Sequence, residues 1–110
     1  MCRRRIEKTT RFNRDLKRLR RHPGLNSKVQ DVLNNLATGK IADKNKLKDM
    51  DGKPVYKIRC GTKNMGARSG ARIIYYKDDS KLIALHIYVK NDRENVPSKE
   101  IMTFLKENGL

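Results

Sequence analysis

Alternating apolar and polar positions predict three strands in the second half of the chain, at 55–60, 70–77 and 82–90. Because successive side chains on a strand point to opposite faces, each segment also places polar side chains on one face. We therefore expect a small antiparallel sheet with an apolar face and a basic, hydroxyl-bearing face. The polar positions are Lys57, Arg59, Arg72, Tyr76, His86, Tyr88 and Lys90.

The first half of the chain follows a helical period instead. From Thr10, a candidate N-cap, apolar residues recur at i, i+4 and i+7, which predicts a helix with one apolar face. The sequence His-Pro-Gly at 22–24 interrupts that helix. A second amphipathic helix is predicted from Leu25 to a stop at Gly39. The short break between them indicates a helical hairpin.

Two further elements complete the predicted fold. A short strand is expected at 3–9, and a last helix is expected to begin at Val96-Pro97-Ser98. The predicted fold is therefore α+β, with the order β-α-α-β-β-β-α in a single domain over residues 1–110. The last strand also carries four alternating aliphatic residues that we expect to face the helices: Ile83, Leu85, Ile87 and Val89.

Charge narrows the class of partner. The chain has 27 Lys and Arg against 12 Asp and Glu, a net charge of +15. Residues 1–21 hold ten basic and two acidic side chains, and residues 55–76 hold five basic and no acidic ones. Such a surface attracts polyanions, above all nucleic acid, although solvated lysines alone would look similar. An arginine stripe on the first helix fits an RNA backbone or a solvated face equally well: Arg11, Arg14, Arg18 and Arg21.

Other classes of protein are disfavoured. Cys2 and Cys60 are the only cysteines, and neither lies in a metal-ligand spacing, so we expect no metal and no disulfide framework. Cys60 alternates with apolar residues and is expected to pack as a small hydrophobe. The chain has no long apolar run, and its start lacks the apolar stretch of a signal peptide. We therefore expect a cytoplasmic protein without a membrane partner or a small-molecule cofactor.

The predicted basic face suits phosphodiester chemistry. RNA is cleaved without a metal when its 2′-hydroxyl attacks the adjacent phosphate, a base takes the hydroxyl proton, and an acid protonates the leaving 5′-oxygen. Arg59 and Arg72 offer bidentate forks for that phosphate, and Lys57 or Lys90 could donate charge or act as base. The alternative interpretation is a solvated basic face without catalysis.

Aromatic residues and a loop extend this picture. Tyr76 or Tyr88 could stack on a splayed base, and His86 could transfer protons or be structural. The glycine-rich loop 61–70 is not a Walker A loop, because it lacks the terminal Gly-Lys-Ser/Thr and no helix follows. It could grip phosphate or serve as an ordinary hairpin connection. The residues that suit phosphate contact are Lys63, Arg68 and Ser69.

Three segments together resemble one protein family. Val55-Tyr-Lys-Ile-Arg59, Ser69-Gly-Ala-Arg-Ile-Ile-Tyr-Tyr76 and Ile87-Tyr-Val-Lys-Asn-Asp-Arg-Glu-Asn-Val96, in this order of elements, resemble the RelE/ParE toxin superfamily. Its HigB-like branch is the most similar. Arg68 stands where that branch has a lysine, and Lys90 lies closer to the following Glu-Asn than in the branch pattern.

The resemblance implies the toxin of a type II toxin–antitoxin pair that cuts mRNA in the ribosomal A site without a metal. It implies catalytic roles for Arg59, Arg72 and Lys90, with Lys57 and Ser69 as adjacent, weaker matches. The implied partners are the ribosome, mRNA and a cognate antitoxin, often of helix-turn-helix type. Two alternatives remain: a ParE-like inhibitor of DNA gyrase, and a basic RNA-binding protein without catalysis.

Overall fold

A single four-stranded sheet organises the computed structural model, which describes residues 4–43, 45–61, 70–90, 93 and 95–110. The strand order is β1-β4-β3-β2. Strands β2, β3 and β4 run antiparallel as predicted, whereas the edge strand β1 pairs parallel to β4. The strands are β1 (Arg5–Lys8), β2 (Val55–Cys60), β3 (Ala71–Lys77) and β4 (Lys81–Val89).

Three helices in the described part of the chain complete the predicted order: α1 (Thr10–Arg18), α2 (Leu25–Thr38) and α4 (Ser98–Glu107). Helix α1 begins one residue after its N-cap Thr9, whose Oγ1 accepts a hydrogen bond from Phe12 N at 3.0 Å, so the predicted cap was one residue late. Gly24, at φ +77°, separates the two helices of the hairpin, and Gly39, at φ +81°, ends α2. Among the described residues, no helix is long and apolar enough to cross a membrane.

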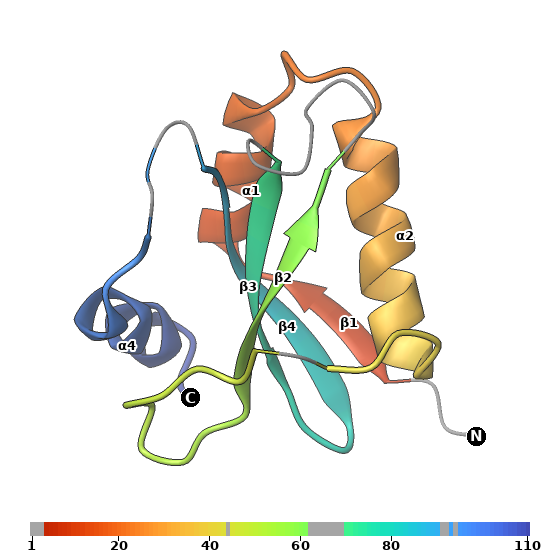
Figure 1. Cartoon of the computed structure of the whole chain (residues 1–110). Coiled ribbons are helices and arrows are strands. Elements are labelled where there is room, and N and C mark those ends of the chain that lie inside the picture. The colour runs from red at the N-terminus through yellow and green to blue at the C-terminus, as the bar shows by residue number, and fades with distance from the viewer. Residues whose placement is uncertain (1–3, 44, 62–69, 91–92, 94) are drawn as a thin grey trace.

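Helices α1 and α2 lie on one face of the sheet, and α4 lies on the other (Figure 1). The face toward α1 and α2, which we call the covered face, holds the larger apolar cluster, with Phe12, Leu33 and Ile73 fully buried. The opposite face, which we call the open face, packs against α4 through Leu85 and Phe104. The two faces therefore have separate cores, and α4 serves only the second one.

A bulge in β4 changes which side chains meet the helices. Ile74 pairs with His86, but the next residue of β3 pairs with Ala84, so Leu85 is left without a partner in the ladder. The prediction that four alternating aliphatic residues share one face was therefore wrong. Ile83 and Leu85 pack on the open face, and Ile87 and Val89 pack on the covered face.

The connector between α2 and β2 covers the free edge of β2. Leu47 N donates to Val55 O at 2.8 Å, and Lys57 N donates to Asn45 O at 3.3 Å. Asn45 itself has a φ of +57°, in the left-handed region that asparagine tolerates better than most residues. This backbone pairing fixes Asn45 beside the polar end of β2.

Asp43 ties the same connector to β3. Its carboxylate accepts a hydrogen bond from Tyr75 Oη at 2.9 Å and forms an ion pair with the buried Lys77 Nζ at 2.9 Å. Burial, followed by the Asp43 carboxylate, raises the pKa of the Tyr75 hydroxyl. The contact satisfies a buried charge and holds the connector against the sheet.

Candidate active site

A cavity of about 290 Å³ opens on the polar end of the open face. We call this cavity the basic pocket. Of the described residues that line it, four are cationic, two are neutral and none is acidic. They are Asn45, Lys57, Arg59, Arg72, Tyr88 and Lys90.

Strand register explains why these side chains meet. Arg59 pairs with Arg72, and Arg72 pairs with Tyr88, so one row of side chains crosses three strands. Lys57 lies two residues before Arg59, and Lys90 follows Tyr88 by two, which puts both on the same face as the row. The structure thus brings together all four residues predicted to be catalytic.

Arg72 is the most enclosed cation of the basic pocket, with 7% of its surface exposed. Its Nη1 donates to the Gly70 carbonyl at 2.6 Å, which fixes the guanidinium plane. A guanidinium has five N–H donors, so others remain for a ligand. Arg59 lies directly opposite on the next strand, and like charges in such a pair repel. A bound phosphate would relieve that repulsion while accepting hydrogen bonds from both forks.

Tyr88 forms one wall of the basic pocket. Burial raises the pKa of its hydroxyl, and the nearby charges of Arg72 and Arg93 act in the opposite direction. Arg93 is itself held by Glu100 at the start of α4, in a bidentate pair with distances of 3.1 and 2.7 Å. The charges of two guanidinium groups therefore stabilise the ionised form of the Tyr88 phenol.

Asn45 is a pocket residue that the sequence interpretation missed. It comes from the connector, 12 residues before Lys57, and reaches the pocket only because the connector pairs with the edge of β2. The available signal was weak: asparagine is enriched at left-handed positions, but an Asn in a polar connector has many other uses.

Two strand residues that were predicted to contact RNA do not line the basic pocket. His86 is buried, with its Nδ1 at 2.6 Å from Asp15 Oδ2. Tyr76 lies at the other end of β3, where its hydroxyl donates to Asp78 Oδ2 at 3.2 Å. Three hydrogen bonds from Ser80 and Lys81, led by that from the Ser80 N–H, help lower the pKa of Asp78 to about 2, so this carboxylate organises the turn.

The arginine stripe of α1 is only partly available. Arg11 forms an ion pair with Glu107 at 2.7 Å, and its guanidinium carbon lies 4.5 Å from the centre of the Phe104 ring. Arg11 therefore secures α4, and its contact with RNA stays a prediction. Arg14 and Arg18 are exposed, as predicted. Three predicted contact residues, Lys63, Arg68 and Ser69, lie outside the described residues.

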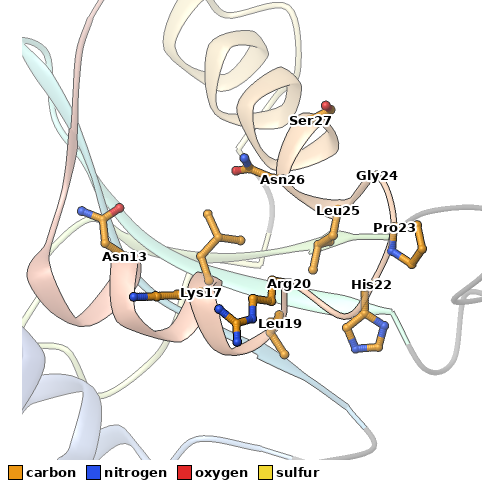
Figure 2. A pocket seen from close by; sticks show the side chains of 11 residues that line it. Asn13, Lys17, Leu19, Arg20, His22, Pro23, Gly24, Leu25, Asn26 and Ser27 are labelled. Atoms are coloured by element: carbon orange, nitrogen blue, oxygen red, sulfur yellow. The ribbon is translucent and has the colours of Figure 1, made fainter.

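A second cavity, of about 410 Å³, lies at the elbow between α1 and α2 (Figure 2). Its side chains come from one continuous stretch of chain and include Leu19, Leu25 and Pro23 beside Lys17 and Arg20. Two of the residues that line it, Lys17 and Arg20, are Lys or Arg, against four in the basic pocket. In the described part of the chain, no group of three or more His, Cys, Asp or Glu residues could hold a metal ion.

A family model and a solved structure that are similar to this chain both describe RelE toxins. Residues 4–109 match the family model described as the RelE toxin of the RelE / RelB toxin-antitoxin system. A mutant of the toxin RelE from E. coli, solved in the free state, superposes with a TM-score of 0.58 at 19% sequence identity. The match covers 84% of this chain and 90% of that chain, and it supports the fold. No curated protein sequence matches.

Proposed function

Because this chain belongs to the RelE toxin family, we propose that it is an endoribonuclease that cuts mRNA on the ribosome and so inhibits translation. The predicted membership of the RelE/ParE superfamily is confirmed, and so is a toxin of a toxin–antitoxin system. The HigB-like branch stays a prediction. The assignment of RNA cleavage to this family member rests on the chemistry of the basic pocket.

The observation that carries the proposal is the row of Arg59, Arg72 and Tyr88 across three strands, in a pocket lined by four cations. Cleavage by the 2′-hydroxyl passes through a phosphorane with more negative charge than the starting phosphodiester. Donors held in place before the reaction stabilise that added charge without reorganising. Arg59 and Arg72 are paired across neighbouring strands, and Lys57 and Lys90 flank the row. The burial of Arg72 strengthens its interaction with the phosphate.

We assign roles by chemistry. Arg72 and Arg59 hold the phosphate oxygens, and Lys57 or Lys90 assists proton transfer. The O2′–P bond forms as the P–O5′ bond breaks, the 2′-hydroxyl proton goes to the base, and the 5′-oxygen gains a proton from the acid. The products are a 2′,3′-cyclic phosphate and a 5′-hydroxyl. Tyr88 forms the wall against which a nucleotide of the RNA lies.

Partners follow from the same assignment. Arg14 and Arg18, exposed on α1, suit contact with the ribosomal RNA backbone. A cognate antitoxin belongs to the family's biology, and an acidic segment laid over the basic pocket would neutralise it. That the antitoxin is of helix-turn-helix type stays a prediction.

The experiment is a cell-free translation reaction with a defined mRNA, in which the 5′ ends of the fragments are mapped. Wild-type protein is expected to cut inside the reading frame only when ribosomes are translating. Arg72→Ala is expected to abolish the cuts, because it removes the enclosed guanidinium. Arg5→Ala is the matched control, since the Arg5 side chain is 70% exposed on the edge strand.

Two results would contradict the proposal. Intact mRNA with normal translation would exclude the nuclease, and a block of DNA supercoiling in a parallel gyrase assay would then identify the ParE-like alternative. Equal cutting by wild type and Arg72→Ala would exclude the basic pocket as the active site.

A further inference from the structure

A buried carboxylate–imidazole contact lies behind the basic pocket and has no part in the mechanism above. Asp15 on α1 and His86 on β4 are 7% and 8% exposed. Their Oδ2 and Nδ1 atoms are 2.6 Å apart, although the two residues are 71 positions apart in the sequence. Burial of two polar groups costs desolvation free energy, which apolar side chains of similar size would avoid. We therefore look for a role of this contact besides packing.

His86 also contacts two aromatic rings, one stacked and one tilted. Its ring centre lies 5.6 Å from that of Tyr88, with 19° between the planes. On another side, the Phe104 ring of α4 lies 5.1 Å away at 49°. Tyr88 follows His86 by two residues on the same strand face and pairs with Arg72. The imidazole therefore supports the tyrosine that walls the basic pocket.

Asp15 determines how that support is oriented. A carboxylate that accepts from Nδ1–H fixes both the tautomer and the rotation of an imidazole ring. Among the described residues, His86 Nε2 has no hydrogen-bond partner, so Asp15 is the only polar anchor found there. Asp15 holds the edge of the His86 ring, and the face of that ring stacks on Tyr88. The fixed imidazole therefore leaves the Tyr88 ring little room to turn.

We propose that Asp15 and His86 are positioning residues that hold Tyr88 beside Arg72, in the orientation in which its phenol meets the bound RNA. The inference rests on the proposed function. It differs from a purely structural role, in which the contact would join α1 to β4 without affecting the chemistry.

The test is single-turnover cleavage of ribosome-bound mRNA by Asp15→Asn, a change that keeps the volume of the side chain. We expect the rate constant at saturating ribosomes to fall by about 10-fold or more, because small misplacements of contact groups slow reactions strongly. The ribosome concentration for half-saturation should stay within about 2-fold. In a Tyr88→Phe background, Asp15→Asn should have almost no further effect.

Controls separate positioning from folding. Asp78→Asn also removes a carboxylate, but one that accepts from the Tyr76 hydroxyl at the far end of the sheet, and this variant should cut at the wild-type rate. If Asp15→Asn does not fold, the double variant Asp15→Leu/His86→Met removes both polar partners together and leaves neither unpaired. It should fold and still cut slowly.

A second readout does not need the nuclease. In protein with labelled tyrosine rings, Asp15→Asn should shift or broaden the Tyr88 signals. Those of Tyr56 and Tyr75, which stack on each other at 5.5 Å, should not change. If wild type cuts nothing, the proposed function fails while this measurement still tests the positioning. Unchanged Tyr88 signals, a wild-type rate for the folded variants, or an equal loss in the Tyr88→Phe background would overturn the inference.

Discussion

The two faces of the sheet use the same three strands for opposite purposes. Ile73, on β3, is fully buried on the covered face, while its neighbour Arg72 points into the basic pocket. The covered face is apolar under two helices. The open face is apolar only where α4 lies, and its other end collects cations. Stability and proposed activity are thus separated by a one-residue step along a strand.

This separation has an electrostatic reason. Four cations around one cavity repel each other, and that repulsion opposes folding. The apolar contacts of the covered face offset this cost, because burial of aliphatic side chains is the dominant favourable term in folding. We therefore expect substitutions on the two faces to have separable effects, with activity lost on one and stability on the other.

Among the substitutions that test this separation, Arg59→Ala should give the largest effect. Removing one preorganised donor lowers a cleavage rate by about 10²–10³-fold. The midpoint of urea unfolding should stay the same or rise, since one repelling charge opposite Arg72 is gone. Single-turnover cleavage and urea unfolding of the same preparation measure both quantities. A large loss of stability would show that the two faces are not separable.

Ile73→Val tests the covered face, at the residue that follows Arg72 on β3. Loss of one buried methyl group costs about 0.5–1.5 kcal/mol of the free energy of unfolding. Because Ile73 points away from the basic pocket, the cleavage rate per folded molecule should stay within about 2-fold. Urea unfolding provides the first value and single-turnover cleavage the second. If Ile73→Val cut slowly but kept the wild-type stability, the separation of activity and stability between the two faces would be contradicted.

Alternation along the strands was enough to predict the cations of the basic pocket. Lys57 and Arg59, or Tyr88 and Lys90, are two residues apart, so each pair shares a face wherever the strand is regular. The boundaries of α2 could also be predicted, since Gly24 and Gly39 both adopt left-handed backbone. Local rules of this kind need no knowledge of the rest of the fold.

Long-range contacts could not be predicted in the same way. The bulge at Leu85 depends on how β4 meets β3, and nothing in the alternating aliphatic pattern marks it. Asn45 enters the basic pocket through backbone pairing with β2. Likewise, the contact of Asp15 with His86 joins two elements far apart in the sequence. Each of these is determined by packing between elements rather than by local pattern.

Cys60 gives the smallest expected effect and tests whether the covered face stays closed. Burial raises the pKa of its thiol from 9.0 to about 11, with the Lys28 charge acting in the other direction. The unfolded thiol ionises first, so the folded state holds more protons above pH 8, and stability falls as pH rises toward 11. At pH 9 the loss is about 0.4 kcal/mol, since half of the unfolded thiols are ionised.

The measurement is urea unfolding between pH 7 and pH 10 for Cys60→Ala and its parent, both carrying Cys2→Ser. The parent should lose stability over this range by more than Cys60→Ala does, since only the parent has the thiol. Thiol labelling of the folded parent at pH 8 should be slow and should accelerate on unfolding, because a buried, protonated thiol is a poor nucleophile. Fast labelling of the folded protein would mean that the covered face opens readily, and the assignment of stability to that face would then fail.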